Sequence, residues 1–153
     1  MSNLEKEFYT VRGYAILNQE DNNLTPSMED YLEMSYRLSV ERGFTRITDL
    51  ANALNVQPPS ASKMVSKLAD MDYLIFEKYG IIQLTKIGHE LGEYLINRHV
   101  IIESFLKIIG VKENVLEQTE KIEHFINDAT LKRIEVLIKF FKKNPECLQK
   151  LNI

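Results

Sequence analysis

The sequence is poor in the residues that several protein classes need. It has a single cysteine, Cys147, in 153 residues. The chain can therefore form neither an internal disulfide nor a zinc site built from several cysteines, and it fits a reducing cytoplasm. No apolar run approaches the roughly 18 residues that a membrane-spanning helix requires, and the acidic start, residues 1–7, lacks the apolar segment of a signal peptide. We expect a cytoplasmic protein with no membrane association.

Positive charge is also scarce, because 19 Lys and Arg stand against 22 Asp and Glu, a formal net charge of −3. Proteins that coat nucleic acid are basic, so any DNA binding must come from a local patch. The chain lacks a glycine-rich phosphate loop and a Ser/His/Asp arrangement. None of its three histidines follows a glutamate by three residues, the spacing of di-iron carboxylate enzymes. These absences disfavour an enzyme.

The first half of the sequence predicts a winged helix-turn-helix. Thr25-Pro26 combines an N-cap with a proline in the first helical turn, and Pro58-Pro59 opens a later helix in the same way. A short helix is expected between them, after Thr48-Asp49. Two β-type runs, 73–78 and 81–84, then read as a hairpin. Helix, short helix, turn, helix and hairpin in this order are typical of a winged helix-turn-helix.

Three further helices are expected in the second half. The first runs from Thr85 to about Ile109, the next from Glu113 to Ile126, and the last follows Asn127-Asp128 and is broken by Pro145. The first of these carries more apolar surface than a small head can cover, so it should be buried in a second domain or a dimer partner. We expect a mainly α protein with an N-terminal arm over 1–23, a DNA-binding domain over 24–84 and a helical dimerisation domain over 85–153.

A cluster of acidic and histidine residues at 120–124 is the strongest candidate site. On a helix, Glu120, Glu123 and His124 fall within about a 100° arc. The flanking Ile122 and Phe125 indicate that this face lies near the core. Carboxylates at i, i+3 repel each other, and burying them costs free energy unless a group such as a divalent cation pairs with them. A surface charge network explains the same pattern as well.

Three residues elsewhere could join this cluster. Asp30 and Glu33 share one face of the first helix, and His99 lies in the middle of the long apolar helix. Each also has an ordinary explanation. Acidic residues are favourable near a helix N-terminus, and a lone histidine on an apolar helix is commonly a core residue.

Residues 24–126 resemble the manganese transport regulator (MntR) branch of the diphtheria toxin repressor (DtxR) family. The resemblance is carried by segments spread along the chain, namely 25–33, 62–68, 73–79, 98–99, 105–111 and 120–124. It implies a metal-dependent transcriptional repressor with a winged-helix head and a helical domain that binds metal and dimerises. The family's metal positions fall on Asp30, Glu33, His99, Glu120, Glu123 and His124.

The chemistry of these six side chains agrees with the resemblance. Four carboxylates and two imidazoles form a set of oxygen and nitrogen donors without a thiolate, which suits Mn²⁺ or Fe²⁺. Two divalent ions per subunit would neutralise the four carboxylates. In the iron-responsive branch, the positions of Asp30 and Glu120 resemble places that hold Met and Cys, so the oxygen ligands here favour manganese. Two alternatives stay open: an iron-responsive regulator of the same fold, and a winged-helix regulator that senses an organic ligand.

The third helix is expected to enter the major groove of a double-stranded, palindromic operator, where a homodimer reads two half-sites about 34 Å apart. Short polar side chains at its start would contact base edges, and lysines on the helix and the wing would contact phosphate. Ordinary surface lysines are the competing explanation. The predicted DNA contacts are Gln57, Pro59, Ser60, Ser62, Lys63, Lys67, Lys78 and Tyr79.

Overall fold

The computed structural model of the chain describes residues 24–151, which form two compact units that divide between Leu95 and Ile96. The division falls inside one continuous helix, α5, Lys86–Ile108. The arm predicted over residues 1–23 lies outside the described residues. Among the described residues, no helix is both long and apolar enough to cross a membrane.

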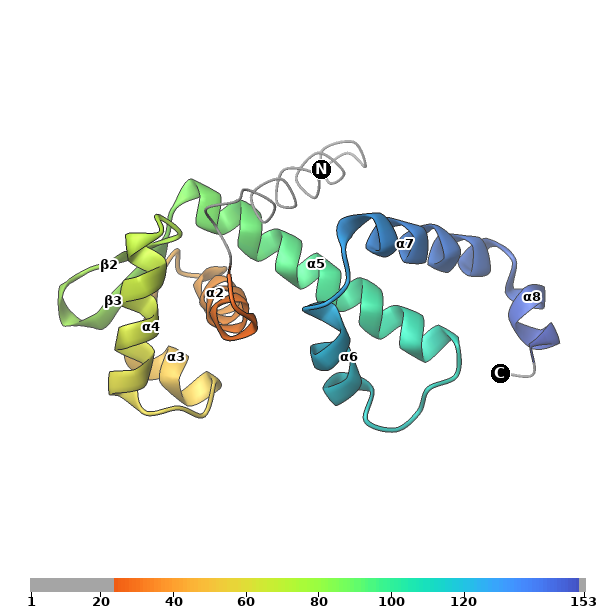
Figure 1. The fold of residues 1–153 in the computed structure, drawn as a ribbon, viewed down its shortest axis with the longest axis horizontal. Coiled ribbons are helices and arrows are strands. Elements are labelled where there is room, and N and C mark those ends of the chain that lie inside the picture. The colour runs from red at the N-terminus through yellow and green to blue at the C-terminus, as the bar shows by residue number, and fades with distance from the viewer. Residues whose placement is uncertain (1–23, 152–153) are drawn as a thin grey trace. The chain divides into compact units, whose positions relative to one another are not determined.

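The first unit is a winged helix-turn-helix, as predicted (Figure 1). Its strands are antiparallel in the order β1-β3-β2, and a short 3₁₀ turn, Lys78–Gly80, closes the β2–β3 hairpin that forms the wing. The remaining elements of this unit are α2 (Pro26–Ser39), β1 (Thr45–Arg46), α3 (Ile47–Ala53), α4 (Pro58–Asp70), β2 (Leu74–Phe76) and β3 (Ile81–Leu84).

Local sequence signals fix most of these boundaries. The side chain of Thr25 accepts a hydrogen bond of 3.2 Å from the backbone N–H of Met28, which confirms it as the N-cap of α2. Gly43 follows α2 in the left-handed conformation, with φ +76°, and donates its N–H to the carbonyl of Ser39. Strand β1 was not predicted, because two residues are too few to show a β periodicity.

The core of the first unit draws a fully buried side chain from nearly every element, and these side chains hold the helices against the sheet. They are Leu32, Leu50, Val65, Leu68, Tyr73 and Ile82. The exposed side of α4 is thereby turned away from the core, which is the requirement for a recognition helix.

Two glycines let α5 pack closely within the first unit. A Cβ on Gly88 would overlap the carbonyl oxygen of Tyr73, and a Cβ on Gly92 would meet the ring of Tyr36 at 2.7 Å. The hydroxyl of Thr85 accepts from the N–H of Gly88, which confirms the predicted cap at the start of α5. The backbone of α5 therefore lies directly against α2, the helix that carries Asp30 and Glu33.

The second unit is all-helical. After the end of α5 come α6 (Val115–Glu123), α7 (Asp128–Lys143) and α8 (Pro145–Lys150). Its buried side chains include Ile102, Leu106, Leu131 and Ile138. Pro145 ends α7 as predicted, but it also opens α8, where we expected only a short tail.

Helix α6 is shorter than the predicted helix over 113–126. It ends at Glu123, His124 is its C-cap, and the side chain of Asn127 already caps α7 by accepting from the N–H of Thr130. The prediction that Phe125 lies near the core is wrong, because its side chain is 85% exposed. Since α6 ends at Glu123 and residues 124–125 form a turn, the helical spacing argument does not extend to Phe125.

Candidate metal centre and nucleic-acid interface

Three predicted metal ligands meet in the second unit. Nδ1 of His99, on α5, lies 2.9 Å from Oε2 of Glu123, the last residue of α6. Nε2 of His124 lies 3.8 Å from the other oxygen of the same carboxylate. Glu123 is only 3% exposed. The structure therefore places a buried carboxylate between two imidazoles that are 24 and one residue away in the sequence.

Helix α6 presents Glu123 inward because of its register. Thr119, one turn before Glu123, is fully buried and donates its hydroxyl proton to the carbonyl of Val115. The same face of the helix therefore carries Thr119 and Glu123 toward α5. Asn114 sets the start of this helix in the left-handed conformation, with φ 52°.

Glu120 lies on the exposed side of α6, one turn before Glu123. It forms no hydrogen bond or ion pair with the residues that the structure describes. Its role as a ligand stays a prediction.

Glu103 is a neighbour of His99 that the sequence analysis missed. Its Oε2 lies 3.6 Å from Nε2 of His99, and its Oε1 lies 2.5 Å from Nζ of Lys107. The three residues are spaced four apart on α5, so the helical rule for i, i+4 contacts could have found them. Both ring nitrogens of His99 thus face a carboxylate.

Asp30 and Glu33 lie one turn apart on α2 of the first unit, as predicted. Glu33 is half-buried and forms an ion pair of 3.3 Å with Arg37. Helix α2 is held in place within its unit by the contact between Tyr36 and Gly92, and by the edge-on packing of Tyr36 against His89.

The donors in the second unit fit a divalent ion. A buried carboxylate is costly unless it is paired, and two imidazoles beside it add nitrogen donors that suit Mn²⁺, Fe²⁺ or Zn²⁺. Nδ1 of His99 and Oε2 of Glu123 are hydrogen-bonded to each other at 2.9 Å, and two donors at about 2.1 Å from one ion would have a similar separation of about 3 Å.

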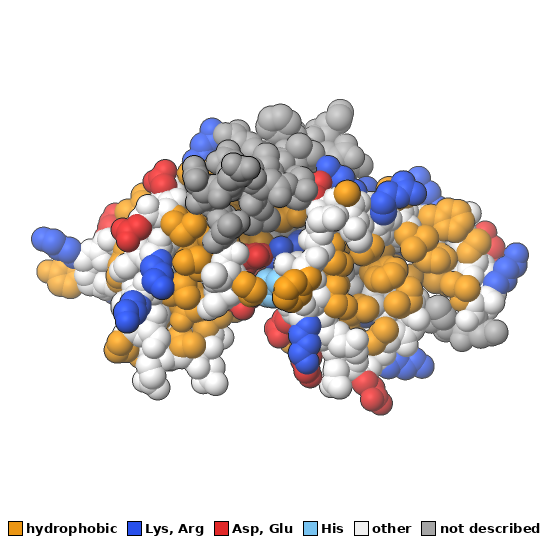
Figure 2. All heavy atoms as spheres, viewed as in Figure 1, with side chains coloured by type: hydrophobic (Ala, Val, Ile, Leu, Met, Phe, Trp, Pro, Cys, Tyr) orange, Lys and Arg blue, Asp and Glu red, His pale blue; other side chains and the backbone are white. Residues whose placement is uncertain are grey.

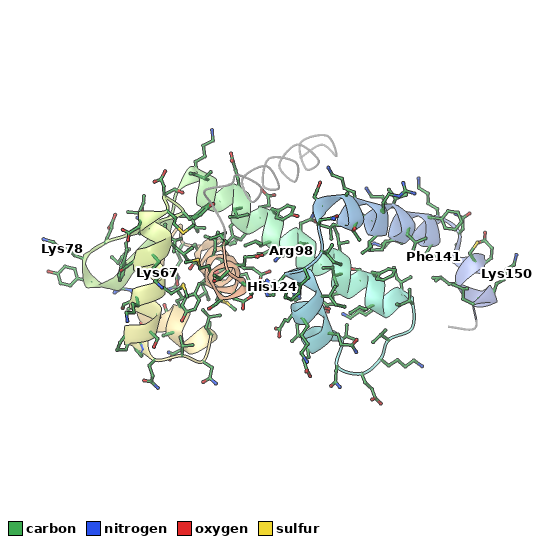
Figure 3. The ribbon with its side chains drawn as sticks, in the orientation of Figure 1. Lys67, Lys78, Arg98, His124, Phe141 and Lys150 are labelled. Carbon is green, nitrogen blue, oxygen red and sulfur yellow. The ribbon has the colours of Figure 1, made fainter. Side chains whose placement is uncertain are left out.

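The predicted DNA contacts are nearly all on the surface of the first unit. Ala61, Val65 and Leu68 are the buried side of α4, and Figure 3 shows Lys67 on this helix and Lys78 at the end of the wing. Seven of the predicted residues are exposed and one, Ser62, is half-buried; the exposed ones are Gln57, Pro59, Ser60, Lys63, Lys67, Lys78 and Tyr79.

The tip of the wing is formed by Lys78 and Tyr79. Tyr79 is 91% exposed and adopts a left-handed conformation, with φ 63°. An aromatic side chain so exposed is available for contact with another molecule. Glu77, Asp70 and Asp72 are also exposed, so the unit is not strongly basic.

Two family models together match almost the whole chain. The iron dependent repressor N-terminal DNA binding domain matches residues 23–82, and the iron dependent repressor metal binding and dimerisation domain matches residues 85–152. The chain belongs to the iron-dependent repressor family.

Relatives of this repressor confirm the MntR branch that the sequence resembles. The chain is 46% identical over 121 residues to the transcriptional regulator MntR of Shouchella clausii (strain KSM-K16), which covers 78% of this chain and 85% of the relative. It is 43% identical over 128 residues to MntR of Geobacillus kaustophilus (strain HTA426), with 83% and 91% covered.

Solved structures of similar repressors share the fold. The manganese regulator SloR matches with a TM-score of 0.67 at 30% identity, over 76% of this chain and 55% of that one. The apo form of the manganese-activated repressor ScaR matches with a TM-score of 0.60 at 31% identity, over 71% and 53%. The chain thus spans about half the length of these structures. As a family member, it is a metal-dependent, DNA-binding transcriptional repressor that binds a divalent metal and dimerises.

Proposed function

We propose that this repressor is manganese-responsive, acts in the cytoplasm, and controls metal homeostasis genes as a homodimer on a palindromic operator. The observation that carries the proposal is the buried carboxylate of Glu123 between the imidazoles of His99 and His124. The relatives named MntR, and the manganese regulators SloR and ScaR, support manganese as the metal.

The proposed ligands come from three helices and the turn that follows α6. The set has oxygen and nitrogen donors only, and its four carboxylates would be neutralised by two divalent ions per subunit. The ligands are Asp30, Glu33, His99, Glu120, Glu123 and His124. Fe²⁺ would accept the same donors, so iron is the competing metal in the experiment below.

These ligands would couple the two halves of the repressor. Asp30 and Glu33 belong to the unit that carries α4, whereas the other four belong to the unit that dimerises. A bound ion supplies the positive charge that the carboxylates lack. Without that charge the carboxylates repel one another. Binding of the ion by residues of both units would therefore shift the population toward the arrangement that binds DNA.

The exposed face of α4 is the proposed reader of the major groove. The N–H groups at its start can bind phosphate, and Gln57, Ser60 and Ser62 can reach base edges. Lys63 and Lys67 would contact phosphate groups. On the wing, Lys78 and Tyr79 would contact the DNA backbone. Pro59 would also contact the DNA backbone, by packing against it. Binding should weaken steeply as salt is raised.

The proposed dimer contact is a second apolar face of α7. Val136 and Phe140 each lie two residues from the buried Ile138, which is about 200° around the helix. Val136, Leu137 and Phe140 are 50%, 39% and 49% exposed, and Figure 2 shows hydrophobic side chains gathered over α7. A helix that is apolar on two sides is normally covered on both. Because the family's dimerisation domain spans this helix, we assign the face to a second copy.

The experiment compares the wild type with Glu123→Gln and a matched control, Glu117→Gln. Glu117 is an exposed glutamate of the same helix, and its ion pair with Lys121 touches no proposed ligand. A duplex is first selected from a randomised pool by the Mn²⁺-loaded protein. Its affinity is then measured by fluorescence anisotropy with Mn²⁺, Fe²⁺, Zn²⁺ or a chelator.

Mn²⁺ should tighten duplex binding by the wild type and the control at least tenfold, and the Glu123→Gln variant should lose this response. A full Mn²⁺ response in that variant would show that Glu123 is not a ligand. Equal duplex affinity with Mn²⁺ and with chelator in the wild type would refute metal sensing. A response to Fe²⁺ alone would mean that the repressor senses iron and not manganese.

A further inference from the structure

We propose that Ile47 is a positioning residue for the wing, and that its side chain keeps Lys78 and Tyr79 where they contact DNA. The inference rests on the DNA contacts proposed above for these two residues. Ile47 itself does not contact DNA in this proposal; it acts through the backbone of Gly80.

The pairing of the strands places Ile47 opposite the end of the wing. Strand β1 pairs antiparallel with β3, and its last residue, Arg46, lies opposite Ile81. The next step of this register sets Ile47 opposite Gly80, the last residue of the turn that closes the hairpin. Strand β1 ends there because Ile47 begins α3. Beyond the last backbone pair, the contact with the wing is therefore made by a side chain.

The side chain of Ile47 fills the space beside Gly80. A Cβ on Gly80 would lie 2.8 Å from Cγ2 of Ile47 and 3.5 Å from its Cβ. The shorter distance is well inside the separation of about 3.5–4.0 Å that two carbon atoms prefer. The γ-methyl group of Ile47 is therefore in direct contact with the backbone of the wing turn.

The turn needs such a contact because its backbone is in a disfavoured conformation. Tyr79 and Gly80 are both left-handed, with φ of 63° and 72°. Glycine adopts this conformation freely, whereas a residue with a Cβ keeps it only where the surrounding structure fixes it. Within the hairpin, the N–H of Glu77 donates to the carbonyl of Ile81 at 2.8 Å. Ile47 adds a contact from outside the hairpin.

The side chains at the tip of the wing cannot fix its position themselves. Lys78 is exposed, Tyr79 is 91% exposed, and Figure 3 shows Lys78 extending from the end of the wing. Exposed side chains pack against little, so the positions of both follow the backbone of the turn. The contact at Gly80 thus determines where a cation and an aromatic ring meet DNA.

Three substitutions of Ile47 separate this contact from apolar volume. Ile47→Val keeps both carbons bonded to Cβ, and with them the contact with Gly80. Ile47→Ala removes both carbons, and Ile47→Leu keeps the volume of the side chain but leaves only one carbon on Cβ. Ile47 is half-buried, so these variants should fold, as their unfolding midpoints will show. If Ile47→Ala does not fold, Ile47→Leu decides.

The first measurement is made on the free protein without metal or DNA. The ¹H–¹⁵N heteronuclear NOE of the Tyr79 and Gly80 amides reports motion of the wing tip on the picosecond to nanosecond timescale. The NOE should fall in Ile47→Ala and Ile47→Leu and keep its wild-type value in Ile47→Val. An unchanged NOE in Ile47→Leu would overturn the proposal, whatever the protein binds.

The second measurement is a double-mutant cycle on the Mn²⁺-loaded protein, with the selected duplex and fluorescence anisotropy. Ile47→Leu should lower duplex affinity at least about threefold, and Ile47→Val should not. Lys78→Ala should cost less affinity in the Ile47→Leu background than in the wild type, because a mobile wing has already lost part of that contact. Lys63→Ala, on α4, is the matched control and should cost the same in both backgrounds.

The cycle also distinguishes the proposal from a general loss of stability and from the proposed function. An equal cost of Lys78→Ala in both backgrounds would overturn the proposal. A reduced cost of Lys63→Ala would also overturn it, because Ile47 would then support the whole unit and not the wing. If Lys78→Ala and Tyr79→Ala cost nothing in the wild type, the wing does not contact DNA. Ile47 would then have no role in binding, although metal sensing and the contacts of α4 would stand.

Discussion

Among single residues, Tyr73 shows how the first unit tolerates a polar group in its core. Its ring is fully buried beside the hairpin, and its hydroxyl forms no hydrogen bond with any residue in the described part of the chain. Burial raises the pKa of this hydroxyl. An unpaired buried hydroxyl costs about 1–3 kcal/mol, so the ring stabilises the fold while its oxygen opposes it.

Tyr73→Phe should therefore leave the free energy of unfolding unchanged or raise it by about 1 kcal/mol, measured by urea denaturation at pH 7. The sign at high pH follows from the raised pKa: the folded state holds the proton more strongly, so stability falls as the pH rises above the unfolded value of about 10. The variant should lose less stability there. Tyr79→Phe, at the exposed wing tip, is the control, and a clear loss of stability in Tyr73→Phe would mean that the hydroxyl has a partner.

The candidate metal site shows what single residues in a sequence can and cannot predict. The i, i+4 spacing of His99, Glu103 and Lys107 is visible in the sequence alone, because helix geometry by itself brings such residues together. The pairing of His99 with Glu123 cannot be predicted in this way. The two residues are 24 positions apart and meet only because α6 packs against α5. Resemblance to a family supplied that pairing where local rules could not.

At the scale of elements, caps and breakers predicted the helices well. Thr25, Pro58, Thr85 and Asn127 each begin a helix at or next to the expected residue. The errors lie where local signals are weak. Strand β1 exists because Thr45 and Arg46 pair with Ile82 and Ile81, far along the chain. Helix α6 ends early because Asn127 starts the next helix, although the apolar pattern continues to Ile126.

Helix α4 is the element on which DNA affinity should depend. Lys63→Ala should lower duplex affinity severalfold and reduce the slope of log affinity against log salt by about one, because one phosphate contact is lost. Mn²⁺ affinity of the free protein should not change. Lys112→Ala, an exposed lysine of the second unit, is the control for net charge. An unchanged salt slope in Lys63→Ala would place Lys63 away from phosphate.

At the scale of the whole molecule, the question is how a chain of net charge −3 binds DNA tightly. One copy offers few lysines on α4 and the wing, and exposed acidic residues lie near them. Two copies joined through their second units double the number of contacts with DNA. Once one copy is bound, binding of the other copy to the second half-site becomes an intramolecular event. Affinity should therefore depend on dimerisation as much as on any single contact.

Phe140→Glu should separate the copies, because it places a charge in the proposed apolar dimer face of α7. We expect a monomer in analytical ultracentrifugation at micromolar concentration, with duplex affinity reduced at least tenfold and the helical content of the wild type. Lys139→Glu changes the charge of the adjacent residue off that face and should remain dimeric. A dimeric Phe140→Glu variant would exclude this face as the contact.

The close approach at Gly92 links two positions that are 56 residues apart in the sequence. Any side chain at position 92 would occupy the space of the Tyr36 ring, so a larger residue at position 92 would require a smaller one at position 36. Tyr36 lies on the same helix as Asp30 and Glu33. The position of these two proposed metal ligands therefore depends on Gly92, because only a residue without a side chain leaves room for the Tyr36 ring.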